Sequence, residues 1–149
     1  MATWQQFERE APELAGIVRQ RFQAAETHVL ATLRRDGSPR LSGSEVDFSG
    51  SDLSFGSMLN AVKARDLQRD GRCAIHAHPA EGGDAKVAGT AVEVAGADKA
   101  TYTTGNEPPG DFHAFRLNMR EAVVVSVEND ELVTRLWRPE QPVQTFRRT

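Results

Sequence analysis

The hydrophobic positions of the chain follow a helical period up to about residue 25. Within residues 3–25, apolar side chains recur every three or four positions, which places them on one face of a helix. Thr3 is a suitable N-cap, because its hydroxyl can accept a hydrogen bond from a free backbone N–H. Pro12 cannot donate within a continuous helix and favours the start of a second segment. We therefore expect residues 1–26 to form a helical N-terminal segment.

From residue 27 onward the period changes to two, which is typical of strands. Val29, Ala31 and Leu33 alternate with polar or small neighbours, and Asp36-Gly37 follows as a hairpin turn, since glycine accepts the positive φ that such a turn needs. The same pattern predicts seven strands, at about residues 29–33, 40–48, 53–57, 72–78, 86–94, 121–128 and 132–138.

Two short helices are expected between these strands. Asn60 is a good N-cap for a helix that ends near Arg69, and a second helix is expected over residues 98–104, before the break at residues 108–110. Pro139 ends the last strand, and residues 140–149 are expected to form a weakly ordered tail.

Short turns join most of these strands, which favours antiparallel pairing over a parallel sheet with crossover helices. We therefore predict a mainly β (α+β) fold. It is a split antiparallel β-barrel of six or seven strands, with an N-terminal helix and short accessory helices. The length of 149 residues favours one domain over residues 1–149.

Charge and composition exclude several classes of function. The formal net charge of −3 argues against nucleic-acid binding, which needs a surplus of basic residues. No apolar run reaches the ~18 residues that span a membrane, and the acidic N-terminus has no apolar signal core. Cys73 is the only cysteine, so it forms no internal disulfide, and we expect a cytoplasmic protein. His76 and His78 share a strand without a cluster of further ligands, so no metal site is predicted.

The junction between the third predicted strand and the helix after it is the best candidate for a binding site. Free N–H groups and the helix dipole attract an anion at a helix start, and Lys63 lies in the first turn, where a cation is favourable only if an anion is present. The alternative is that Lys63 is an ordinary exposed lysine. On the second strand, Arg40, Ser42 and Ser44 share a face, and small residues there allow a flat ring to approach the backbone. The alternative for this strand is a polar edge that faces solvent.

The segment from Thr27 to Ala77 resembles the flavin-binding split-barrel family that includes pyridoxamine 5'-phosphate oxidase and deazaflavin-dependent reductases. The order is strand, turn, strand, turn, strand, short helix and strand, and the likeness is strongest from Val29 to Val94. Family members place a serine, an arginine and a lysine at the helix start. Here Lys63 matches and is followed by the expected alanine, whereas Ala61 and Val62 occupy the serine and arginine positions.

This resemblance implies a homodimer with a cofactor site at its interface. It assigns cofactor contacts to eleven residues: Arg40, Ser42, Gly43, Ser44, Gly56, Ser57, Met58, Lys63, Ala64, Trp137 and Arg138. For Trp137, a place in the core is the alternative.

The resemblance also implies the chemistry. The cofactor would be FMN or the deazaflavin factor 420, and the reaction would be hydride transfer with a small conjugated organic substrate. The cofactor carries such a reaction, so no general acid or base is named. The alternatives are a non-catalytic flavin carrier or sensor, a haem-binding relative, and a cofactor-free interaction protein. One fold can host all of these activities.

Overall fold

The computed structural model describes residues 2–102 and 111–149. Its helices are α1 (Trp4–Glu10), α2 (Pro12–Gln23), α3 (Val62–Arg69) and a 3₁₀-helix, η1 (Gly96–Tyr102). Its strands are β1 (His28–Leu33), β2 (Pro39–Ser44), β3 (Asp47–Ser49), β4 (Asp52–Met58), β5 (Arg72–His76), β6 (Gly83–Val94), β7 (Phe112–Glu128), β8 (Glu131–Trp137) and β9 (Gln144–Arg148).

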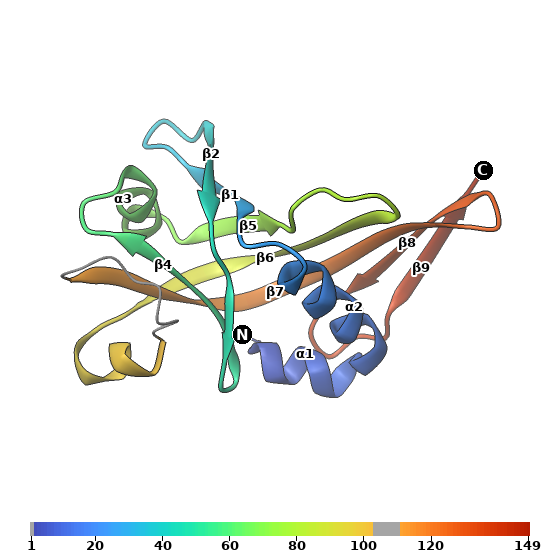
Figure 1. Cartoon of the computed structure of the whole chain (residues 1–149), viewed down its shortest axis with the longest axis horizontal. Coiled ribbons are helices and arrows are strands. Elements are labelled where there is room, and N and C mark those ends of the chain that lie inside the picture. The colour runs from blue at the N-terminus through green and yellow to red at the C-terminus, as the bar shows by residue number, and fades with distance from the viewer. Residues whose placement is uncertain (1, 103–110) are drawn as a thin grey trace.

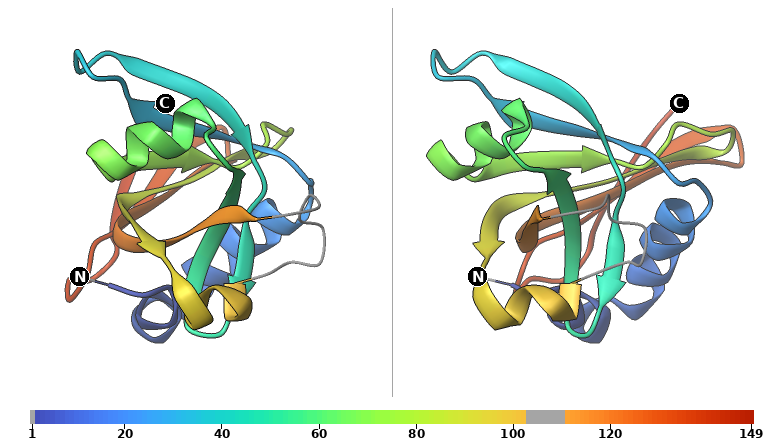
Figure 2. Two further views of the ribbon diagram at one scale, coloured as in Figure 1. Left: turned by 90° about the vertical axis from the view of Figure 1, so that its left-hand side faces the viewer. Right: turned by 60° about the vertical axis from the view of Figure 1, so that its left-hand side comes forward.

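The strands form one antiparallel sheet in the order β2-β1-β5-β6-β7-β4-β3, and β8 and β9 extend it beside β7. β6 pairs with most of one edge of β7. Two other strands share the opposite edge of β7. β4 pairs with the first part of β7 and β8 pairs with the last part. β7 and β6 therefore run the length of the molecule, and two separate strand groups diverge from them (Figure 1). The sheet curls without closing, as the predicted split-barrel fold requires (Figure 2).

The N-terminal segment confirms the helical period and the break at Pro12. The Thr3 hydroxyl accepts a hydrogen bond from the Gln6 N–H at 3.1 Å and caps α1. Ala11 has a non-helical backbone, and Pro12 occupies the first turn of α2, where its missing N–H removes no intrahelical bond.

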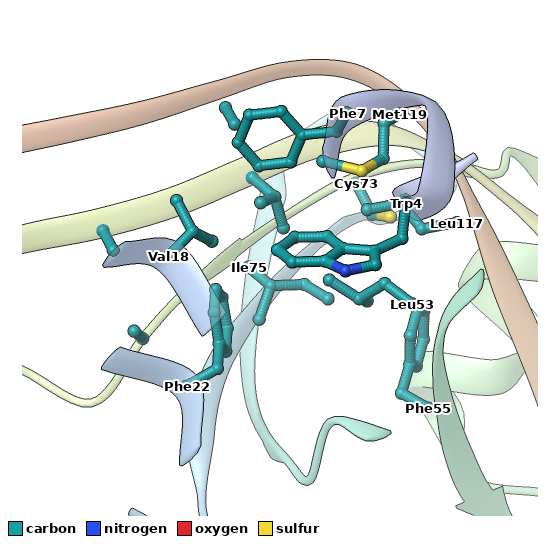
Figure 3. Close-up of a cluster of buried hydrophobic side chains, with 14 of the residues drawn as sticks. Trp4, Phe7, Val18, Phe22, Leu53, Phe55, Cys73, Ile75, Leu117 and Met119 are labelled. Carbon is teal, nitrogen blue, oxygen red and sulfur yellow. The ribbon is translucent and has the colours of Figure 1, made fainter. Parts of the chain in front are cut away.

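Both helices pack their apolar stripe against the sheet and form the main core. Trp4 and Phe7 from α1 and Phe22 from α2 meet Ile75 and other buried sheet residues (Figure 3). Trp137 joins this core, since its ring lies 4.6 Å from that of Phe7 and none of its surface is exposed. No helix in the described part of the chain combines the length and the apolar character needed to cross a membrane.

Several predicted boundaries were wrong. The strand expected over residues 40–48 is two strands, β2 and β3. The segment before residue 121 already belongs to β7, which starts at Phe112. Asn60 is not the N-cap of α3: it adopts a positive φ of 63°, which asparagine tolerates, and Ala61 takes the cap position. The short helix at 98–104 is displaced to η1, and the predicted break at 108–110 lies outside the described residues.

The weakly ordered tail expected at residues 140–149 instead contains β9. Glu140 takes a positive φ of 64°, and its N–H donates to the Glu10 carboxylate at 2.7 Å, so the chain turns back after β8. β9 then pairs with β8, with Phe146 opposite Thr134. The pattern gave no sign of this strand, because every residue of β9 is exposed and none alternates between core and solvent.

Candidate functional site

A cleft of about 500 Å³ opens between the end of β2, the strand β4 and the start of α3. Its size is within the range of ordinary ligand pockets. Small and aromatic side chains form much of its surface, and several polar side chains also line it. The described residues that line it are Thr27, Gly43, Ser44, Glu45, Asp47, Ser54, Phe55, Gly56, Ser57, Met58, Lys63, Tyr102 and Phe112.

Lys63 is the cation of this cleft. It lies in the first turn of α3, whose N-cap, Ala61, offers no side chain to the free N–H groups of the helix start. The Lys63 ammonium donates to the Gly43 carbonyl at 2.8 Å. Burial lowers the pKa of Lys63, and the nearby Glu45 carboxylate opposes that shift. An anion at this end of α3 would meet both the ammonium and the helix N–H groups.

Ser54 presents an unsatisfied polar group to the same cleft. It pairs with Asp47 across β3 and β4, so the two side chains lie on one face of the sheet, while Leu53 and Phe55 face the core. Ser54 is 1% exposed, and its hydroxyl has no hydrogen-bond partner among the described residues. A buried hydroxyl without a partner costs free energy, which a ligand in the cleft would recover.

Tyr102 is held at the rim by a buried carboxylate. Its hydroxyl donates to Asp52 at 2.9 Å, and Asp52 is 7% exposed. Burial and the Asp52 carboxylate both raise the pKa of Tyr102. The phenol therefore stays protonated near neutral pH, and the hydrogen bond to Asp52 holds the ring as an oriented wall of the cleft.

Arg40 lies outside the cleft, on the other side of α3. Its Nε donates to Asp66 at 2.7 Å, and Arg69 and Thr32 donate to the same carboxylate at 3.0 Å and 2.8 Å. Asp66 is 2% exposed. Burial opposes ionisation of this carboxyl, but the three hydrogen bonds outweigh it, and the pKa of Asp66 lies below its usual value.

Replacing Asp66 with asparagine is expected to lower the free energy of unfolding at pH 7 by about 1–3 kcal/mol, since hydrogen bonds to a buried charge are lost. Because the folded-state pKa lies below the reference of 3.8, this contribution is present above about pH 4 and disappears as the pH falls through the folded-state value. Urea unfolding from pH 3 to pH 7 measures the difference from the parent protein.

Asp130→Asn is the matched control, since Asp130 is exposed in the β7–β8 turn and asparagine tolerates its positive φ of 63°. An Asp66→Asn deficit that stays constant down to pH 3 would contradict the ion-pair assignment.

The structure brings together six of the eleven residues implied by the resemblance: Gly43, Ser44, Gly56, Ser57, Met58 and Lys63. Ser42 and Arg40 precede them on β2 and do not line the cleft. Ala64 lies on the buried face of α3 and has no exposed surface. The alternative for Trp137, a core position, is confirmed.

Arg138 lies elsewhere on the sheet. It is exposed, faces Glu121 at 3.6 Å, and lines a separate hollow beside Arg72 and Arg120. The structure therefore does not place Arg138 at the cleft of its own chain.

Sequence reasoning missed seven lining residues: Thr27, Glu45, Asp47, Ser54, Phe55, Tyr102 and Phe112. A period of two from Gly56 back to Ser54 was the available signal for the shared face. Tyr102 and Phe112 could not be placed from the pattern, because they enter the cleft through distant segments.

Other reactive side chains lie apart from the cleft. Burial raises the pKa of Cys73 to about 12, so this thiol is protonated and inert at neutral pH. Within residues 2–102 and 111–149, no group of three histidine, cysteine or acidic side chains is arranged to hold a metal ion. His28 is buried, and its Nδ1 accepts from the His78 N–H at 3.0 Å.

Comparison with known structures places this fold among flavin-related and other proteins. A pyridoxamine 5'-phosphate oxidase-related, FMN-binding protein from Nostoc punctiforme aligns over 92% of this chain and 95% of its own, with 13% identity and a TM-score of 0.69. PhzG from Burkholderia lata, solved with tetrahydrophenazine-1-carboxylic acid, aligns over 93% and 89%, with 16% identity and a TM-score of 0.63.

A heme-binding protein from Mycobacterium smegmatis shares the fold as well. It aligns over 87% of this chain but 55% of its own, with 18% identity and a TM-score of 0.58. At these identities the structural likeness establishes the fold alone. No curated protein sequence matches the chain.

The family model described as pyridoxamine 5'-phosphate oxidase matches residues 15–126. This range includes α3 and all the lining residues of the cleft. The chain belongs to the pyridoxamine 5'-phosphate oxidase family.

Proposed function

We propose that the cleft binds a flavin-type cofactor, FMN or factor 420, and that the protein is an oxidoreductase that acts on a small conjugated organic substrate. The observation that carries this proposal is the half-buried Lys63 at the uncapped start of α3, opening into an apolar cleft of flavin size. A similar protein named as FMN-binding supports FMN as the cofactor.

The residues present fit such a group. Lys63 and the N–H groups of α3 match a phosphate, since both supply positive charge at one point. Gly43 and Gly56 leave room for a flat ring beside the backbone, and Phe112 provides apolar contact. The Ser54 hydroxyl and the carboxylates of the cleft match the polar edge and hydroxyl groups of a flavin.

A bound flavin would supply hydride transfer, and the protein would supply position and an apolar surrounding. Lys63 holds the anionic end of the ligand, and Ser54 orients the polar end. Tyr102 forms part of the wall that keeps water from the ring, and its hydrogen bond to Asp52 holds that wall in place.

We further propose that a second copy of the chain covers the cleft. Leu41, Met58 and Val62 are 71%, 66% and 52% exposed, and they lie on β2, at the end of β4 and at the start of α3, around the cleft. Exposed apolar side chains gathered in this way favour burial against a partner. Sedimentation of the protein at assay concentration measures its oligomeric state, and a dimer is expected. A cytoplasmic location is also part of this proposal.

FMN titration of Lys63→Ala tests the proposed function. The substitution removes a charge-assisted hydrogen bond to the phosphate, and such bonds are worth ~1.5–3 kcal/mol, so the dissociation constant should rise about 10- to 100-fold. Quenching of flavin fluorescence gives the constant, and the same titration with factor 420 distinguishes the two cofactors.

Lys86→Ala is the control, since Lys86 is exposed on β6 away from the cleft. Equal FMN affinity in Lys63→Ala and Lys86→Ala would remove Lys63 from the site. Failure of the parent protein to bind either cofactor would end the proposal.

A non-catalytic flavin carrier is the second candidate. Ala61 and Val62 occupy the positions where relatives place two phosphate ligands, and Val62 points outward with 52% exposure. Weaker retention of the cofactor suits a carrier. Flavin binding without turnover of a panel of quinones and other conjugated acceptors would favour this function.

A further inference from the structure

A second hollow, the arginine groove, lies on the opposite side of α3 from the cleft. It has a volume of about 510 Å³ and runs between the β1–β2 hairpin and α3, which lie side by side in both views of Figure 2. Its lining residues are Arg34, Arg35, Asp36, Arg40, Val62, Arg65, Asp66 and Arg69.

The groove is strongly cationic in an acidic protein. Five of its lining residues are arginines and two are aspartates, whereas the whole chain has a formal charge of −3. Guanidinium groups are suited to phosphate and carboxylate groups, because their paired N–H donors match two oxygens at once. This concentration of positive charge favours a ligand with several negative charges.

Buried Asp66 fixes two of the arginines. Its carboxylate accepts hydrogen bonds from the Nε of Arg40 at 2.7 Å and from one terminal nitrogen of Arg69 at 3.0 Å. Arg69 also donates to the Leu33 carbonyl at 2.7 Å, so its side chain is held at two points. The remaining guanidinium N–H groups of Arg40 and Arg69 stay available on the groove wall, already ordered before a ligand arrives.

The other three arginines have no such anchor. Arg34, Arg35 and Arg65 are exposed, and no ion pair involves them within the described ranges. Asp36 bonds to Ser38 through both the backbone N–H and the hydroxyl, which lowers the pKa of Asp36 and uses one of its oxygens. The groove therefore combines a fixed wall with an exposed cationic rim.

The groove adjoins the cleft around the first turn of α3. Val62 lines the groove and Lys63 lines the cleft, and on β2 Arg40 belongs to the groove and Gly43 to the cleft. Because Val62 and Lys63 are neighbours in the first turn of α3, an extended ligand that passes around this turn can reach both hollows.

We propose that the arginine groove is an oligoanion site that takes two or more linked phosphate or carboxylate groups. The ligand is either the acidic tail of a molecule bound in the cleft or a separate small oligoanion. The first source rests on the proposed function, and the second is independent of it.

Inorganic pyrophosphate is the probe, with orthophosphate as reference, in calorimetric titrations of the flavin-free protein. Pyrophosphate should bind at least tenfold more tightly than orthophosphate. The double variant R35Q/R65Q should weaken pyrophosphate binding at least tenfold and leave the thermal midpoint unchanged, because both side chains are exposed and without ion pairs. R9Q/R148Q, which removes two exposed arginines from α1 and β9, is the charge-matched control.

Two results would overturn the site: equal affinity for pyrophosphate and orthophosphate, or a loss of pyrophosphate affinity in R9Q/R148Q as large as in R35Q/R65Q. Either result would mean that the net charge of the surface attracts anions and that the groove gives no specific binding. Comparison of FMN with factor 420 separates the sources. A tail held in the groove predicts that R35Q/R65Q weakens factor 420 and spares FMN. A separate oligoanion predicts that both cofactors bind unchanged while pyrophosphate binding falls. If the parent protein binds pyrophosphate but does not bind FMN or factor 420, the proposed function is rejected and the arginine groove is retained.

Discussion

Replacing Trp137 with alanine is expected to lower the free energy of unfolding by about 3–5 kcal/mol, the usual cost of removing a large core ring. The Trp137 side chain is fully buried, and its ring packs 4.6 Å from that of Phe7, so it joins β8 to α1. For a chain of this size the thermal midpoint should fall by roughly 10 °C. Urea unfolding followed by circular dichroism measures both quantities.

Val127→Ala on the neighbouring strand is the control, because Val127 is 66% exposed and its truncation should change the free energy of unfolding by less than about 0.5 kcal/mol. Trp137→Ala is also informative about the site. If its folded fraction binds FMN as the parent does, Trp137 acts through packing only. If the Trp137→Ala protein is folded but no longer binds FMN, Trp137 contacts the cofactor, as the resemblance implies.

Replacing Gly89 with alanine is expected to cost about 3 kcal/mol of stability, because overpacking of a rigid site forces the backbone to move. Gly89 lies where the register of β6 and β7 shifts, and an added Cβ would overlap the backbone oxygen and carbon of Asn118. Backbone atoms cannot rotate away as a side chain can. Thermal unfolding of the variant measures the loss.

Gly16→Ala provides a control of opposite sign. Gly16 is exposed in α2, and nothing lies within 4 Å of the added methyl group, so alanine should stabilise the helix by about 0.5–1 kcal/mol. If Gly89→Ala also raised the thermal midpoint, the close approach of β6 and β7 at this point would be incorrect.

The fold was largely predictable because the strands that form the sheet alternate between core and solvent. β1 alternates as expected, and Asp36-Gly37 places the following turn, but the face in the core is the opposite one: Leu30 is buried with His28 and Thr32, whereas Val29, Ala31 and Leu33 are half-buried. β9 could not be predicted, because its stability comes from backbone pairing with β8 rather than from an apolar face. The boundary at Asn60 was wrong because asparagine suits both a helix cap and a left-handed turn.

The candidate site was predictable where local chemistry and resemblance agreed. Lys63 and Gly43 were both expected there, and the structure joins them through a hydrogen bond of 2.8 Å. Arg40 shows the limit of such reasoning, because its strand position was right but its side chain turns to Asp66, which lies 26 residues farther along the chain. Ser54 was missed because a buried unpartnered hydroxyl is recognisable only once the strands around it are in place.

β9 has a consequence for how the molecule behaves at high concentration. In the described structure it pairs on one side only, with β8, so its outer backbone groups offer a template for strands of other molecules. Exposed Phe146 adds an apolar contact to that risk, but it is followed at once by Arg147 and Arg148. When two such edges approach each other, these neighbouring like charges repel, so the terminal arginines protect the protein against aggregation through its last strand.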